Sequence, residues 1–412
     1  MELDTLPYLT RDLPGLGGRI KTHRTDFAVE EIPLYEPSGQ GTHVYFVIEK
    51  VGLPTMQAVH QIARALGVSA RDIGFAGLKD ADAVTTQTLS LEHVDPDRIE
   101  KIDLTGIRVI RVAHHTNKLK LGHLKGNRFR IRLRDVDVTR LDEARAIMDV
   151  LAQRGAPNYF GPQRFGLRGD TWQVGRALLR SDYTEALACL LGRPDDRDRT
   201  EVRRARELFD KGDYDAAADT WPYPMHHERR VCRAMAKARG DAGRGVRALD
   251  KQMRQFFVSA FQSHLFNQVV AQRIDSLDRL EVGDLAWRHP QGAVFTVEDL
   301  TAEKPRCDAF EISPTGPLYG AKMKLPSGPQ GDIERAVLDE AGLTLDSWRE
   351  GHDRKARGGR RPLRFQPHDA DAQVGQDEHG HYLELSFELE SGCYATMFLR
   401  EICKAPSDEN GM

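Results

Sequence analysis

An α+β fold is predicted for this chain of 412 residues. Segments in which apolar and polar residues alternate, as in half-buried strands, occur near both ends of the chain. Between them, residues 168–250 are highly charged and mostly helical in pattern. Strands and helices do not recur as repeated βαβ units, which disfavours a parallel α/β sheet. The pattern therefore predicts one sheet domain that is interrupted by an inserted second domain.

Composition and charge narrow the class of protein. The net charge is −3, so a nucleic-acid partner has to be argued from the distribution of charge and not from its total. No run of about 18 apolar residues occurs, and no membrane span is expected. The five cysteines are scattered without a CxxC pair, which suits reduced thiols in a cytoplasmic protein and predicts no metal site.

The first part of the chain alternates strands with one helix. Residues 26–32 and 43–49 read as strands, the second of them central because it is rich in β-branched and aromatic residues. Thr55 is expected to cap a helix that runs to about Leu66 and ends at Gly67. Residues 107–112 are predicted to form another strand.

A second helix is predicted at residues 139–154. Thr139 and Asp142 approximate a capping box at its start, and Gly155 terminates it. Pro157 then opens a segment punctuated by proline and glycine, which indicates a domain boundary.

The rest of the chain is predicted in broader terms. A long helix is expected at residues 256–273, followed by short strands and turns at 281–326. Residues 351–364 read as an exposed basic loop or hinge. A strand is expected at 381–389, and Gly392 leads from it into a short helix.

The stretch from Gly74 to Gln87 contains the strongest candidate for chemistry. Two glycines allow a tight bend, and Lys79 and Asp80 follow before a run of strand formers. A carboxylate on such a bend is displayed and not packed. A solvated turn with ordinary surface charge is the alternative, and Asp82 is a rival carboxylate that we interpret as part of the turn.

The clearest charge feature lies between residues 111 and 134, which include eight Lys or Arg and no Asp or Glu. Its end alternates strictly, so a strand would bury three apolar residues and expose four arginines on the opposite face. Phosphate contact is the favoured interpretation. The alternative is a solvated face with acidic neighbours from other strands. The four arginines are Arg128, Arg130, Arg132 and Arg134.

Five motifs in order resemble the D family of tRNA pseudouridine synthases (the TruD family). The signature GxKDxxAxTxQ matches residues 77–87, and the other four motifs bracket nearly the whole chain. They are Asp26-Phe27-Ala28-Val29-Glu30-Glu31, Lys125-Gly126-Asn127-Arg128-Phe129, residues 157–166 and residues 394–401. The resemblance implies a mixed or antiparallel sheet in a pseudouridine synthase-type catalytic domain. The domains would be 1–155 and 363–412 for the catalytic part and 156–362 for the insertion.

The resemblance also implies an activity and a set of residues. A uridine of tRNA, at position 13, would be isomerised to pseudouridine without a cofactor and without an implied protein partner. Asp80 would be the catalytic carboxylate, with Lys21 as the cation that keeps it ionised. Phe27, Asn127 and Tyr394 match family positions at the substrate, although some relatives carry Phe in place of Tyr394.

The residues themselves leave alternatives open. The carboxylate could act as a nucleophile or as a base. Phe27 and Tyr394 could belong to the core, Asn127 to a turn and Lys21 to the surface. Two other functions compete with the isomerase. One is a non-catalytic RNA-binding protein, and the other is a glycosidase that would release free uracil.

Overall fold

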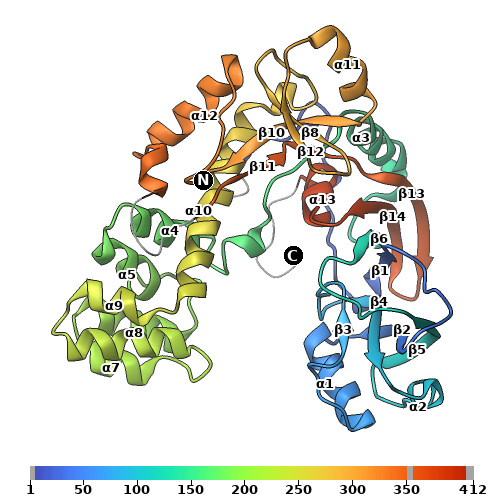
Figure 1. Cartoon of the computed structure of the whole chain (residues 1–412), viewed down its shortest axis with the longest axis horizontal. Coiled ribbons are helices and arrows are strands. Elements are labelled where there is room, and N and C mark those ends of the chain that lie inside the picture. The colour runs from blue at the N-terminus through green and yellow to red at the C-terminus, as the bar shows by residue number, and fades with distance from the viewer. Residues whose placement is uncertain (1–4, 350–355, 405–412) are drawn as a thin grey trace. The chain divides into compact units, whose positions relative to one another are not determined.

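The computed structural model describes residues 5–349 and 356–404, which fold into two compact units (Figure 1). The sheet unit comprises Tyr8–Pro157 and Phe365–Met412, and the insertion unit comprises Met1–Pro7 and Asn158–Arg364. The architecture confirms the predicted α+β class with an interrupted sheet domain. The domain boundaries at 155/156 and 362/363 stay a prediction.

The sheet unit is built on an 8-stranded mixed sheet with the order β13-β14-β6-β1-β4-β2-β5, in which β3 pairs with β4. Only β1 and β4 run parallel among the described pairs. The strands are β1 (Phe27–Pro33), β2 (His43–Val51), β3 (Gly74–Phe75), β4 (Val84–Glu92), β5 (Ile107–His115), β6 (Leu124–Leu133), β13 (His368–Asp377) and β14 (Gly380–Glu390).

One face of this sheet, called the inner face below, is largely buried, because buried residues alternate with more exposed ones along β1, β4, β6 and β14. At the β2 end, helix α1 (Thr55–Leu66) packs its buried stripe onto Val44, Phe46 and Ile48. Gly67 ends the helix with a φ of 69°, as predicted. The expected cap is wrong: Pro54 occupies the N-cap position, and the Thr55 side chain is bound elsewhere.

At the other end of the sheet the inner face is held by aromatic rings. Phe129 on β6 stacks on Phe387 of β14 with centroids 5.1 Å apart, and Phe387 contacts Phe398 of α13 (Ala395–Cys403). The two strands approach closely at Gly126, where an added Cβ would lie 2.2 Å from the Leu389 carbonyl oxygen. Only glycine fits there, because any side chain would push β14 away from β6.

Helix α3 (Leu141–Arg154) lies beside α13 and β13 (Figure 1). The predicted capping box is wrong, because a 3-10 turn at Val138–Arg140 precedes the helix. Asp137 caps that turn and accepts a hydrogen bond from the backbone N–H of Thr139. A short helix, α2 (Pro96–Glu100), links β4 to β5.

The insertion unit is mostly helical, as its sequence predicts. Its helical core is made of α4 to α9 and the start of α10, and includes Trp221, Phe209 and Phe257. These helices are α4 (Thr171–Leu179), α5 (Tyr183–Leu191), α6 (Thr200–Asp210), α7 (Tyr214–Thr220), α8 (His226–Lys237), α9 (Ala242–Ala248) and α10 (Lys251–Gln272).

The second half of the insertion unit carries a 4-stranded sheet with the order β11-β10-β8-β9. Helix α11 lies in a region predicted to hold only strands and turns. Strand β11 lies in the predicted loop at 351–364, of which residues 351–355 are outside the described residues. The elements are β8 (Leu285–Arg288), β9 (Val294–Thr296), α11 (Leu300–Asp308), β10 (Ile312–Leu318), α12 (Gly328–Glu340) and β11 (Gly359–Pro362). None of the described helices is both long and apolar enough to span a membrane.

Candidate active site

Asp80 lies on the bend between β3 and β4, at the inner face of the sheet. Its side chain is 55% exposed, so the carboxylate is displayed to solvent. The neighbouring Lys79 side chain is turned away and buried. The bend thus presents one acid and hides the adjacent base, as expected for neighbours in an extended segment.

Lys21 is the cation closest to the Asp80 carboxylate. Its Nζ lies 3.5 Å from Asp80 Oδ2 and 4.6 Å from the centre of the Phe27 ring. The backbone of Lys21 has a φ of 59°, a left-handed conformation that is uncommon for a residue with a side chain. Such strain is found where the surrounding structure holds a residue in a functional position.

The buried Lys79 forms a second polar cluster beneath the bend. Its Nζ lies 3.3 Å from Glu31 Oε2 and donates a hydrogen bond to Asn127 Oδ1. Burial lowers the pKa of Lys79 and raises the pKa of Glu31, and in each case the partner's opposite charge opposes the shift. The cluster fixes the orientation of Asn127, so that the amide nitrogen stays available to a ligand.

The main chain of the bend is held from α1 and β4. The backbone N–H of Lys79 donates to Thr55 Oγ1 at 2.8 Å, and Thr55 in turn donates to Gln87 Oε1 at 2.8 Å. Lys50, at the end of β2, donates to the Asp80 carbonyl oxygen at 3.1 Å and to the Leu53 carbonyl oxygen. Asp80 therefore sits on a backbone that is tied down on both sides.

The two aromatic candidates are placed differently. Phe27 is buried and meets Phe129 edge-on, with ring centroids 6.3 Å apart, while the Lys21 ammonium lies over its face. Tyr394 is half-buried at the N-cap of α13, just after the strand in which Leu389 pairs with Asn127. The structure brings Lys21, Phe27 and Asp80 together and joins Asn127 to Lys79.

The four arginines do not share the face of Asp80. The predicted alternation is right, because Phe129, Ile131 and Leu133 are buried on the inner face. Consequently Arg128, Arg130 and Arg132 project from the opposite, outer face of β6.

Most of these arginines are also already paired, which is the alternative that the sequence left open. Ion pairs join Arg128 to Glu30 and Glu388, Arg132 to Glu384 and Asp377, and Arg134 to Asp26 and Asp377. Arg134 is 3% exposed, and its two hydrogen-bonded carboxylates raise its pKa. Arg130 is exposed, and it has no acidic partner within ion-pair distance among the described residues. Arg130 is thus the member of the four that has no acidic partner among the described residues, and phosphate contact by these arginines stays a prediction.

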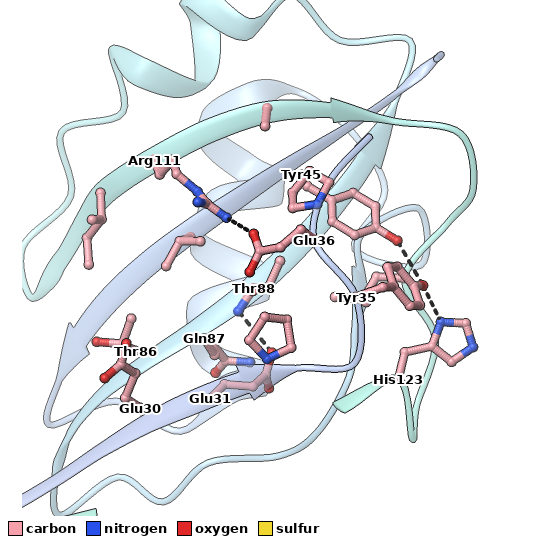
Figure 2. A pocket seen from close by; sticks show the side chains of 16 residues that line it. Glu30, Glu31, Tyr35, Glu36, Tyr45, Thr86, Gln87, Thr88, Arg111 and His123 are labelled. Atoms are coloured by element: carbon pink, nitrogen blue, oxygen red, sulfur yellow. Dashed lines mark hydrogen bonds and ion pairs between the residues drawn. The ribbon is translucent and has the colours of Figure 1, made fainter. Parts of the chain in front are cut away.

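A cavity of about 490 Å³ opens on the same outer face, nearer to β5 (Figure 2). Arg111 and Glu36 form an ion pair of 3.0 Å across it. At its far end the Tyr35 hydroxyl lies 2.8 Å from His123 Nδ1 and 3.3 Å from the Tyr45 hydroxyl. None of these five side chains touches Asp80 in any contact that the structure describes.

Metal-binding groups do not gather in the parts of the chain that the structure describes, where no three His, Cys, Asp or Glu side chains are placed to share an ion. All five cysteines are free thiols.

Sequence reasoning missed Glu31, Thr55, Gln87 and Lys50 as members of this site. Glu31 and Gln87 stand inside quoted motifs, so their position was a usable signal. A threonine at the start of a helical pattern predicts a cap, so Thr55 carried no separate signal of the site. Lys50 had a different signal: it continues the inward-facing series Val44, Phe46, Ile48, where a lysine is out of place.

The chain is similar to known proteins over nearly its whole length. The family model described as tRNA pseudouridine synthase D (TruD) matches residues 3–402. The tRNA pseudouridine synthase D of Geotalea daltonii is 44% identical over 399 residues, covering 97% of this chain and 100% of the relative. That of Geobacter metallireducens is 45% identical, covering 96% and 97%.

A solved structure agrees with these relatives. The crystal structure of a Methanosarcina mazei protein described as a tRNA pseudouridine synthase D (TruD) superimposes with a TM-score of 0.86 at 30% identity. The match covers 97% of this chain and 96% of that one. On the evidence of its motifs, its fold and these relatives, the chain belongs to the tRNA pseudouridine synthase D (TruD) family.

Proposed function

We propose that this protein isomerises a uridine of tRNA to pseudouridine, with Asp80 as the catalytic carboxylate and without a cofactor. The observation that carries the proposal is the exposed Asp80 carboxylate, fixed on a tethered bend and paired with Lys21. The family's function supports position 13 as the target. A tRNA-modifying role also favours the cytoplasm, and the sheet unit as the catalytic domain.

The reaction balances without any outside reagent. The N1–C1′ bond of the uridine breaks, the uracil rotates, and a C5–C1′ bond forms while the proton on C5 is lost and N1 gains one. Positive charge develops at C1′ when the first bond breaks, and a carboxylate can meet it either by bonding to the carbon or by taking a proton. The Lys21 ammonium, 3.5 Å from Asp80 Oδ2, is in place to pair with the carboxylate in either route.

The uridine has to leave its stack to reach Asp80. The amide of Asn127 offers a donor to a uracil edge, since its oxygen is occupied by Lys79. Tyr394 is the half-buried aromatic candidate for holding the base, and the ring of Phe27 lies against the Lys21 ammonium.

The decisive experiment treats a tRNA transcript, tritiated at C5 of its uridines, with the wild-type protein and with Asp80→Asn. The wild type should release tritium and form pseudouridine, and a transcript with cytidine at position 13 should release none. Asp80→Asn should lose several orders of magnitude of turnover while it still binds tRNA.

Asp82→Asn is the matched control, because Asp82 is a second exposed carboxylate on the same bend. It should keep wild-type turnover. A tenth of the wild-type rate in Asp80→Asn would assign the chemistry to another residue. Free uracil among the products would indicate a glycosidase, and unreacted RNA with intact binding would indicate an RNA-binding protein.

A further inference from the structure

Lys50 is a buried charge without a buried carboxylate to pair with it. It is the last inward-facing residue of β2 and has no exposed surface. The acceptors of its hydrogen bonds are two backbone carbonyl oxygens, those of Leu53 and Asp80. The preceding inward-facing residues, Phe46 and Ile48, are packed against α1.

A lysine is a costly residue for this position. Burial disfavours the charged form and lowers its pKa to about 8. A methionine would fill the same volume without that cost. The cost therefore calls for a role that an apolar side chain would not fill.

The contacts of Lys50 indicate that role. Leu53 belongs to the link between β2 and α1, and Asp80 to the bend between β3 and β4. The ammonium bridges these two segments, and hydrogen bonds from a charged donor are about twice as strong as neutral ones. It holds the Asp80 backbone from below while Lys21 holds the carboxylate from the side.

We propose that Lys50 is a positioning residue, which fixes the backbone of Asp80 and places a second positive charge beneath its carboxylate. The inference rests on the proposed role of Asp80. The charged groups that face Lys50 are the Asp80 carboxylate, which favours its protonated form, and the Lys79 ammonium, which opposes it. Glu31 in turn screens Lys79.

The test compares Lys50→Met with Lys404→Met. Lys404 also donates to two backbone carbonyls, those of Thr10 and Leu13, and burial also lowers its pKa. Its acceptors lie in the segment that precedes β1, and not on the bend that carries Asp80. The pair of variants therefore separates loss of a buried lysine from loss of this particular tether.

Three quantities are measured for each variant: tRNA affinity, the single-turnover rate of tritium release, and the midpoint of thermal unfolding. Lys50→Met should lose about tenfold to a hundredfold in rate, because a displacement of about 1 Å at a reacting group costs about a hundredfold. Its tRNA affinity should stay within about twofold of the wild type, because phosphate contacts dominate docking. Lys404→Met should keep the wild-type rate and the wild-type tRNA affinity.

The pH dependence gives an independent readout. As the pH rises, the wild-type rate should fall when Lys50 loses its proton, with a midpoint near pH 8. Lys50→Met should not show this fall. A Lys50→Met rate within twofold of the wild type would overturn the inference, as would equal losses in rate and affinity. If Lys50→Met fails to fold, the wild-type profile of rate against pH decides the inference. A rate that is constant between pH 6.5 and 9 would overturn the inference. A fall in rate near pH 8, seen in both the wild type and Lys404→Met, would support it.

Failure here is distinguishable from failure of the proposed function. Active Lys50→Met together with inactive Asp80→Asn would refute only the tether. Active Asp80→Asn would refute the assignment of Asp80, whatever Lys50→Met does.

Discussion

The two faces of the central sheet use charge in opposite ways. On the inner face, charges are few, buried and held in fixed geometry around Asp80, as in the pair of Lys79 with Glu31. On the outer face, charges are many, solvated and paired across strands, as in Arg128 with Glu30 and Glu388. Charge density therefore does not mark the site: the arginines of β6 lie on one face of the sheet, and the displayed acid lies on the other.

The largest difference between the faces should appear in stability. Lys79→Met removes one partner of a buried pair and should cost about 3–5 kcal/mol, because Glu31 is left as an uncompensated buried charge. Arg128→Met should cost about 0–1 kcal/mol, since its side chain is 56% exposed. Urea unfolding of both variants measures the contrast, and equal losses would refute it.

The pH dependence of stability should isolate Lys50. Its pKa is about 8 in the folded protein and 10.5 in its ordinary state, so the unfolded chain binds more protons between these values. Stability should therefore rise with pH in this window, by about 2 kcal/mol from pH 7 to 9.5 relative to Lys50→Met. Denaturant midpoints of the two proteins at both pH values measure the difference, and parallel curves would contradict the burial cost.

Tyr394 sharpens the comparison on the inner face. If its ring holds the extruded base, Tyr394→Ala should lose about 1–3 kcal/mol of stacking, seen as a fall of about fivefold to a hundredfold in turnover. Tyr394→Phe keeps the ring and should be mild. Binding of tRNA should change less than turnover, and normal turnover or an unfolded Tyr394→Ala protein would place the ring in the core.

The smallest effect should come from the outer face. Arg130→Ala removes a cation without an ion-pair partner among the described residues, and should reduce the slope of log affinity against log salt by about one if it meets a phosphate. Arg132→Ala should change that slope less, because two carboxylates already neutralise it. Equal changes for the two variants would show that tRNA displaces those carboxylates.

Local pattern predicted much of this molecule and failed in identifiable places. The alternation of Phe129, Ile131 and Leu133 is a property of one strand, so their burial was predictable. The acids that neutralise the arginines, such as Glu30 and Glu384, come from strands far away in the sequence, and strand order is not written in any single segment.

The candidate site was predictable to the same extent. Asp80 and Lys21 were found through motifs, and their ion pair of 3.5 Å agrees with the expected partnership. The tethers were not found, because Thr55 and Lys50 act through backbone groups of a segment more than 20 residues away. A threonine at the start of a helix normally indicates a cap. Here the Thr55 hydroxyl instead accepts from the Lys79 backbone and donates to Gln87.

The pairing of β6 with β14 also determines when the central sheet can be completed during synthesis of the chain. The seam at Gly126 and Leu389 joins strands that the whole insertion unit separates in the chain. On a ribosome, residues 158–364 emerge and can fold before β14 has been made. The edge of β6 that pairs with β14 therefore stays unpaired through that interval. An unpaired strand edge can pair with other chains, so β6 is exposed to such association until β14 has been made.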